Sequence, residues 1–167
     1  MCHGFKFFCF LILTSFFIQA QEPEIPHYFQ FLKPLIGKTW VAPFPGGGGS
    51  DTQVFEWVYE GKFLRNTHFV KDAEGKTVYE GETIFAWDYK KKAVVWWYWN
   101  TTGGHMVGTM WEEDGVQIFE GENNAPAGQT AKARGAFKIK EGSWTSIQYF
   151  WKDGAWAKQG EMIFKAQ

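Results

Sequence analysis

Histidine is the residue type to consider first for chemistry, because it binds metals, holds haem and transfers protons. His27, His68 and His105 are widely separated, and no metal-ligand spacing such as H-x-H or H-E-x-x-H occurs among them. We therefore expect no metal site. A single histidine can still be an axial haem ligand in an aromatic pocket, and His105, beside Met106, is the candidate. For His68 we expect an ordinary hydrogen bond at a strand face.

Arginine offers a second kind of chemistry. Arg65 lies between Leu64 and Phe69 in a mainly apolar stretch. A guanidinium in an apolar barrel would bind a carboxylate through planar, bidentate donors. The alternative is an outward arginine that pairs with Glu80 or Glu82 on the next strand. These two glutamates could act as acid and base if they were buried, and otherwise they form a solvated stripe.

The stretch "VVWWYWN" at 94–100 is apolar on both faces. Alternate side chains of a strand point to opposite sides, so Trp96 and Tyr98 share one face and Trp97 and Trp99 share the other. One face either looks into an apolar cavity or fills a core. A single bulge exchanges the two faces, so both parities stay open. The candidate ligand site has Phe85, Trp96 or Trp97, Tyr98 and Trp111 as its wall and Arg65 or His105 as its polar contact.

The elements that would position these side chains follow from turn signals spaced along the chain. Pairs such as Glu60-Gly61, Asp114-Gly115 and Asp153-Gly154 separate about ten short alternating stretches. Of the six prolines, only Pro126 follows Gly46, so the remaining stretches are free to pair as sheet. The sequence predicts an all-β fold, a single antiparallel up-and-down β-barrel of about ten strands. A two-sheet sandwich is the structural alternative.

A short helix is predicted before the first strand, in "PHYFQFLKPLIG". Pro26 suits a first helical turn, and Pro34 should end the helix early. We expect the helix to lie as a plug across one open end of the barrel, with an ordered coil as the alternative. The apolar residues at helical spacing are Tyr28, Phe31, Leu32 and Leu35.

The first twenty residues have the pattern of a secretory signal peptide. Lys6 precedes an apolar run that ends in the small residue Ala20. We expect cleavage after Ala20, a barrel domain over 21–167 and a periplasmic or secreted protein. The alternative is a signal-anchor, although the run is short for a membrane span. We expect no transmembrane segment in the mature chain.

Composition excludes several classes of function. Both cysteines, Cys2 and Cys9, lie in the predicted signal peptide, so the mature chain would have no disulfide, thiolate nucleophile or cysteine metal site. The net charge is -1 and the chain has no basic run. Both facts argue against nucleic acid or anionic lipid as a partner. Aromatic residues make up 20% of the chain, which favours a small hydrophobic molecule as the partner.

The stretch "LIGKTWVA" and the layout around it resemble the calycin superfamily of lipocalin-like barrels. The resemblance rests mainly on Gly37 and Trp40. It implies that Trp40 closes the barrel base at the start of the first strand. Lipocalins usually show G-x-W, where this chain has an extra residue, and Lys165 stands where an arginine often covers the tryptophan. Many exported bacterial barrels of this type have no assigned function.

The function expected from these observations is non-enzymatic binding of a small hydrophobic or amphipathic ligand in an aromatic-lined cavity, with no cofactor. One alternative is a filled barrel that acts through an exposed tryptophan patch. Another is a nitrobindin-like haem barrel that uses His105, but "TWVAPF" lacks the later glycines of the G-x-W-x-G-x-G run. An enzyme would need Glu82 or His105 to converge inside the cavity.

Overall fold

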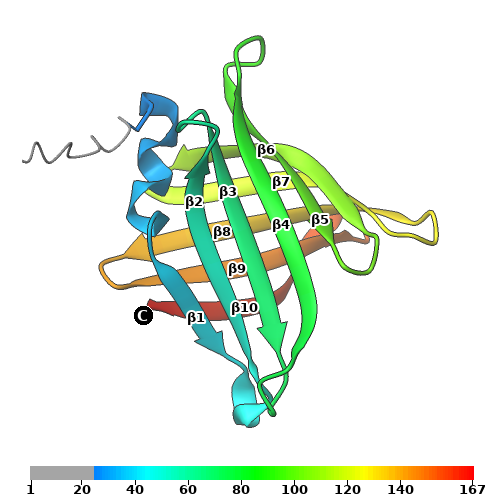
Figure 1. Ribbon diagram of the computed structural model, residues 1–167. Coiled ribbons are helices and arrows are strands. Elements are labelled where there is room, and N and C mark those ends of the chain that lie inside the picture. The colour runs from blue at the N-terminus through cyan, green and yellow to red at the C-terminus, as the bar shows by residue number, and fades with distance from the viewer. Residues whose placement is uncertain (1–24) are drawn as a thin grey trace, which may run out of the picture.

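A computed structural model of the chain describes residues 25–167 (Figure 1). Ten antiparallel strands pair in chain order in one sheet, and β10 returns to β1 to close it. This closure confirms the all-β, up-and-down barrel of about ten strands and leaves no second sheet of the kind a sandwich needs. The predicted signal peptide and its cleavage after Ala20 lie outside the described residues.

Two short helices and ten strands make up the described chain. They are η1 (His27–Leu35), β1 (Thr39–Pro43), η2 (Pro45–Gly47), β2 (Ser50–Val58), β3 (Phe63–Lys71), β4 (Thr77–Asp88), β5 (Ala93–Asn100), β6 (His105–Glu113), β7 (Val116–Asn124), β8 (Thr130–Lys140), β9 (Ser143–Lys152) and β10 (Ala155–Ala166). Within residues 25–167, neither helix has the length and apolar character needed to cross a membrane.

The tight turns have the backbone that the sequence signals require. Asp114 and Gly115 have φ angles of 51° and 74°, and Asp153 and Gly154 have 51° and 84°. Positive φ at both central residues is the requirement of a type I′ hairpin turn, whose twist matches that of the strands it joins. These turns hold β6 to β7 and β9 to β10 as direct antiparallel neighbours.

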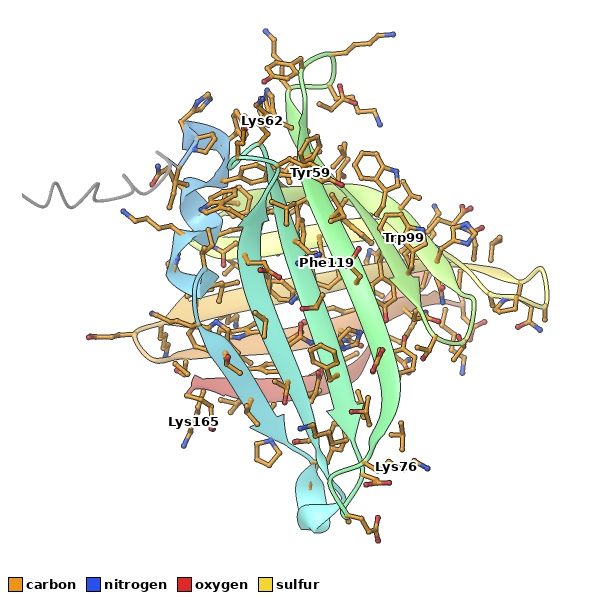
Figure 2. All side chains as sticks on the ribbon, in the orientation of Figure 1. Tyr59, Lys62, Lys76, Trp99, Phe119 and Lys165 are labelled. Carbon is orange, nitrogen blue, oxygen red and sulfur yellow. The ribbon has the colours of Figure 1, made fainter. Side chains whose placement is uncertain are left out.

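In space, β1 to β5 form the near wall of the barrel and β6 to β10 cross behind them (Figure 1). Helix η1 lies at one end, near the turn that carries Tyr59 and Lys62. Lys76 marks the opposite end (Figure 2). Tyr28 of η1 stacks on Trp87 with ring centroids 4.7 Å apart, and Phe29 lies 5.5 Å from Trp57. The predicted plug is therefore present.

Helix η1 is a 3-10 helix, and this changes which residues face the core. Phe29, Leu32 and Leu35 are fully buried. They lie three residues apart, which matches the three-residue turn of a 3-10 helix. The α-helical spacing assumed from the sequence, with its period of 3.6, missed Phe29. Tyr28 and Phe31, which it did include, also pack against the core. Both are only partly buried.

Trp40 at the start of β1 is fully buried beneath η1. Its indole Nε1 donates a hydrogen bond of 2.8 Å to the carbonyl of Leu35, which ties the strand to the helix. Gly37, with φ of 72°, donates from its backbone N–H to the carbonyl of Phe55 at 3.0 Å. The cation over the indole ring is Lys38, 5.5 Å from the ring centroid, whereas the family resemblance pointed to Lys165.

Candidate ligand-binding cavity

The barrel encloses a cavity of about 360 Å³ that is partly open to solvent. This volume lies in the range of small-molecule sites, roughly 300–1,000 Å³. Its wall is mainly aromatic, and a smaller group of polar side chains lies among the rings. The apolar lining includes Phe55, Phe85, Trp96, Phe119, Phe137 and Trp144. The polar lining includes Gln53, Asn66, His68, Tyr79, Tyr98 and Gln148.

Strand β5 settles which face of the aromatic stretch looks inward. Trp96 and Tyr98 line the cavity, whereas Trp97 and Trp99 lie on the outside and are 37% and 48% exposed. Figure 2 shows Trp99 on the outer side of the barrel wall. The pairing of β5 with β4 and β6 runs without a register shift, so the two faces stay distinct along the strand.

Trp96 fits inside the barrel because glycines stand opposite it on the next two strands. Gly108 pairs with Trp96, and Gly121 pairs with Gly108. A Cβ atom at Gly121 would lie 2.8 Å from the Trp96 ring, closer than real Cβ contacts. The indole Nε1 donates to the carbonyl of Thr109 at 2.9 Å, which fixes the ring across this row. Glycines in mid-strand thus make room for the wall of the cavity.

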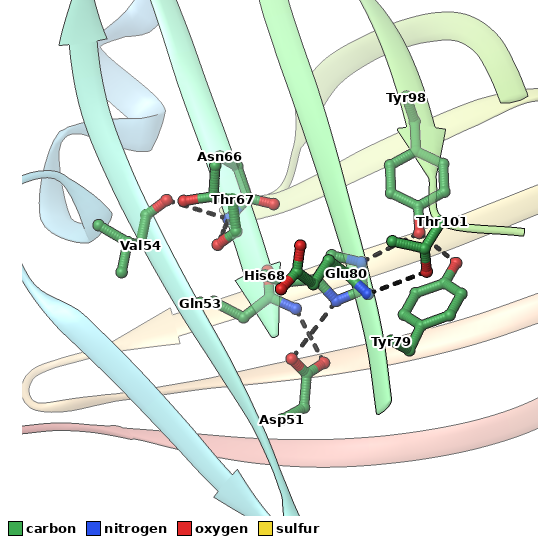
Figure 3. Close-up of polar contacts among 10 residues, drawn as sticks. All are labelled: Asp51, Gln53, Val54, Asn66, Thr67, His68, Tyr79, Glu80, Tyr98 and Thr101. Carbon is green, nitrogen blue, oxygen red and sulfur yellow. Dashed lines mark hydrogen bonds and ion pairs between the residues drawn. The ribbon is translucent and has the colours of Figure 1, made fainter. Parts of the chain in front are cut away.

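A chain of four polar side chains lies in the half of the barrel away from η1, and we call it the polar chain: Asp51, His68, Tyr98 and Tyr79 (Figure 3). Asp51 Oδ1 lies 3.4 Å from His68 Nδ1. His68 Nε2 lies 3.0 Å from the hydroxyl oxygen of Tyr98, which is itself hydrogen-bonded to the hydroxyl of Tyr79. The predicted hydrogen bond of His68 is confirmed, and it lies inside the barrel.

Four consecutive strands contribute one member each to the polar chain. Asp51 comes from β2, His68 from β3, Tyr79 from β4 and Tyr98 from β5. Gly81 of β4 stands directly opposite His68. Because Gly81 has no side chain, the Tyr98 ring reaches over β4 to His68, and a Cβ atom at Gly81 would lie 2.6 Å from the Tyr98 hydroxyl oxygen.

Burial sets the protonation of the tyrosine in the polar chain. It raises the pKa of Tyr98 far above the ordinary value, because the phenolate would lose its hydration there. Tyr98 therefore remains a neutral phenol under ordinary conditions. Asp51 is 7% exposed, and its Oδ2 accepts a hydrogen bond of 2.9 Å from Gln53 Nε2. His68, Tyr79 and Tyr98 line the cavity, and Asp51 lies behind His68.

Three of the ligand residues proposed from the sequence meet in the cavity wall: Phe85, Trp96 and Tyr98. Trp97, Arg65, Trp111 and His105 are not brought there. The reason is strand parity, since each of these four directly adjoins a residue that lines the cavity. These neighbours are Trp96, Asn66, Met110 and Met106. His105 is exposed and Trp111 is partly buried.

Arg65 lies on the outside of the barrel, as the alternative for this residue proposed. Its Nη2 is 2.7 Å from Glu56 Oε1, and its Nη1 is 3.8 Å from Glu82 Oε2. The partner on the following strand is Glu82 and not Glu80, and the nearer partner comes from the preceding strand. Since the guanidinium and Glu82 are outside, neither reaches a ligand in the cavity.

Asp51 and Tyr79 were missed in the sequence, and the mid-strand glycines, which are the available signal, mark other residues of the cavity. Gly81, Gly108, Gly121 and Gly135 all interrupt strands in their middle, which marks close approach by another group. In the strand register Gly81 pairs with His68, and the Tyr98 ring lies over Gly81. Mid-strand glycines therefore indicated where large rings lie, whereas the identity of the facing residues required the register.

Comparison with protein-family models finds no match to this chain, and comparison with curated proteins finds none either. The closed ten-strand antiparallel barrel is compatible with a calycin-like barrel. Function must therefore be argued from the cavity itself. Among residues 25–167, no group of three or more His, Cys, Asp or Glu side chains is placed to hold a metal ion.

Proposed function

We propose that the barrel binds a small, mainly apolar molecule in its interior cavity. The observation that carries this proposal is a space of about 360 Å³ walled mainly by aromatic rings, with a smaller group of polar side chains among them. A predominantly apolar cavity with a few converging polar groups is the common form of a ligand site. A barrel filled by its own side chains would leave no such space.

The cavity does not favour the haem alternative with His105, because that side chain is outside the barrel wall. Among the described residues, His68 is the histidine that lines the cavity. Its Nε2 contacts the Tyr98 hydroxyl and its Nδ1 faces Asp51. A metal bond to this imidazole would have to replace one of these contacts, so the site suits an organic ligand better.

We also propose that the protein is exported after cleavage behind Ala20 and that it is a member of the calycin superfamily. Support for export is the apolar run after Lys6. Support for the superfamily is the closed barrel together with Gly37 and Trp40 at the base. Mass spectrometry of the secreted or periplasmic fraction should find a chain that begins at Gln21, and an intact Met1 there would contradict export.

The binding proposal can be tested by filling the cavity. Ala133 lines it and is almost fully buried, so Ala133→Phe places a ring in the ligand space. The uncharged fluorescent probe N-phenyl-1-naphthylamine should bind the wild type and lose at least tenfold in affinity for this variant. The matched control is Ala155→Phe at the exposed first residue of β10, which should bind like the wild type. Equal binding by both variants would contradict an interior site.

A second candidate function rests on the exposed tryptophans outside the barrel. Trp97 pairs across the sheet with Val107, which is 44% exposed, and Trp99 lies two residues along the same face. Exposed apolar patches of this kind mark contact surfaces between proteins. The partner that we propose for this surface is the same surface on a second copy of the barrel. Sedimentation velocity should then show self-association that the double variant Trp97→Ser, Trp99→Ser removes, and a monomer at high concentration would contradict it.

A further inference from the structure

The charges around the cavity limit what kind of polar group a ligand can carry. Arg134 is the one lining residue, among the described residues, with a permanent positive charge. Its guanidinium is already engaged, since Nε lies 3.1 Å from Glu120 Oε2 and the group lies 5.3 Å from the Trp156 ring centroid. A carboxylate ligand would therefore enter without a free cation, beside the buried Asp51, and an unpaired buried charge is costly.

Hydrogen-bond direction along the polar chain gives a second constraint. The Asp51 carboxylate has acceptor atoms only, and its Oδ1 lies 3.4 Å from His68 Nδ1, so this contact favours the tautomer with the ring proton on Nδ1. In that tautomer Nε2 accepts a hydrogen bond from the Tyr98 hydroxyl. Either hydroxyl of the Tyr79–Tyr98 pair can be the donor, and in this arrangement the Tyr98 oxygen accepts from Tyr79. Every proton of the chain is used, and the Tyr79 oxygen is left with acceptor capacity at the cavity.

A hydroxyl group complements this arrangement in both directions. It donates to the Tyr79 oxygen when the hydrogen bonds of the chain run in the direction just described. If they run in the opposite direction, Tyr79 donates and the hydroxyl accepts equally well. The groups that face His68 from the neighbouring strands are Asp51 on β2, Tyr79 on β4 and Tyr98 on β5. None of them supplies a cation for an anionic ligand.

We propose that the ligand is an uncharged apolar molecule that carries a hydroxyl group, and that this hydroxyl binds Tyr79 as the outer member of the polar chain. This inference rests on the proposed function and narrows it to one chemical class. It differs from one of the two sequence-based interpretations of Arg65, in which an arginine inside the barrel would bind a carboxylate. Asp51 and His68 are positioning residues, because they act on the ligand through the two tyrosines.

Three probes with the same ring system separate the possibilities: naphthalene, 2-naphthol and 2-naphthoate. Each is measured by its displacement of N-phenyl-1-naphthylamine from the full protein at neutral pH. The wild type should bind 2-naphthol about fivefold more tightly than naphthalene, which is the effect of one net hydrogen bond. It should bind 2-naphthoate at least tenfold more weakly than 2-naphthol, because the carboxylate has no free cation.

The variant Tyr79→Phe removes only the outer hydroxyl of the polar chain. It should bind naphthalene as the wild type does and lose the preference for 2-naphthol. The matched control, Tyr89→Phe, removes an exposed hydroxyl in the β4–β5 turn and should keep that preference. Unchanged naphthalene binding shows that the cavity of the Tyr79 variant is intact.

The outcomes separate this inference from the proposed function. Naphthalene and 2-naphthol bound equally by the wild type, or 2-naphthoate bound most tightly, would overturn the hydroxyl class and leave the binding function standing. A preference for 2-naphthol that survives in Tyr79→Phe would overturn the role of Tyr79. Failure of the wild type to bind any of the four compounds would overturn the proposed function and this inference with it.

Discussion

Tyr98 is the residue on which the polar chain depends, because it touches both His68 and Tyr79. Its ring lies in the cavity wall and its hydroxyl is enclosed by the other two side chains. Desolvation disfavours the phenolate, which raises the pKa of Tyr98 far above the ordinary value near 10. The folded protein therefore holds this proton more tightly than the unfolded chain does.

This difference predicts a loss of stability in alkali. Below pH 10 both states keep the proton, and the raised pKa has no effect. As pH rises above 10, Tyr98 ionises in the unfolded chain only, so the free energy of unfolding falls by about 1.4 kcal/mol per pH unit from this group. Urea unfolding at several pH values gives the free energy of unfolding of the wild type and of Tyr98→Phe. The difference between the two proteins measures the contribution of Tyr98.

Lysines and other tyrosines also titrate in this range, but they are common to both proteins. The stability advantage of the wild type over Tyr98→Phe should thus shrink between about pH 10 and 11. A constant difference across these pH values would show that Tyr98 ionises in the folded barrel as easily as in the unfolded chain.

On the scale of single elements, the inward glycine of β4 is what allows the polar chain to cross a strand. Gly81→Ala would push a methyl group against His68 and Tyr98. We expect a loss of about 1–3 kcal/mol in the free energy of unfolding, as for other overpacked interiors. The matched control is Gly160→Ala on β10, where a Cβ atom meets nothing within 4 Å.

Denaturant unfolding measures both glycine variants, and histidine NMR signals report the His68 environment. Gly160→Ala should be as stable as the wild type or slightly more so, because alanine costs less chain entropy. Equal stability of the two variants, with an unchanged His68 signal, would show that the barrel absorbs the extra methyl group without strain.

Helix η1 contributes to stability through one narrow face. Leu32→Ala removes a fully buried side chain at the centre of that face, and we expect a loss of about 2–5 kcal/mol in the free energy of unfolding. Lys33→Ala, on the adjacent exposed residue, should change it by less than about 0.5 kcal/mol. Thermal unfolding compares them, and a small effect of Leu32→Ala would mean that η1 is dispensable to the barrel.

Turn chemistry explains why the elements were largely predictable. Pairs such as Asp114-Gly115 and Asp153-Gly154 have few alternatives to a tight hairpin, so strand number and order followed from the sequence. The 3-10 form of η1 did not follow, because Tyr28, Phe31, Leu32 and Leu35 fit an α-helix as well as Phe29, Leu32 and Leu35 fit a 3-10 helix. Docking uses members of both sets, since Tyr28 stacks on Trp87 and Phe29 packs against Trp57.

For the molecule as a whole, the weakest pairing is the one that closes the barrel. β1 pairs with β10 at only two positions, Trp40 with Ala166 and Val41 with Lys165. By contrast, β3 pairs with β2 at nine positions and with β4 at eight. Local opening follows the regions with the fewest stabilising contacts.

Amide hydrogen exchange should therefore be faster in β1 than in β3. We expect protection factors of β1 amides to be at least tenfold lower, measured by NMR or mass spectrometry on the native protein. Equal protection of the two strands would show that the hydrogen bond from Trp40 to Leu35 holds the closing pair as firmly as the longer ladders hold their strands.

The site was predictable at this scale only in outline. An aromatic surplus in a barrel of ten strands indicated an apolar interior, and Phe85, Trp96 and Tyr98 do line it. His105 was proposed as a contact inside the barrel, and Arg65 was left open between an inward and an outward position, because both faces of these strands carry apolar residues. Parity was decided by closure of the whole barrel, which no local pattern contains.

The same closing pair has a consequence for how the chain folds as it is made. Nine of the pairings join strands that follow one another directly, so each hairpin can form as soon as its second strand has been synthesised. Trp40 must wait for Ala166, near the last residue, before β1 gains its second partner. Until then β1 is an open sheet edge with unpaired backbone groups, the kind of edge that invites pairing with another chain. Synthesis of the final strand is thus the step at which this risk of aggregation ends.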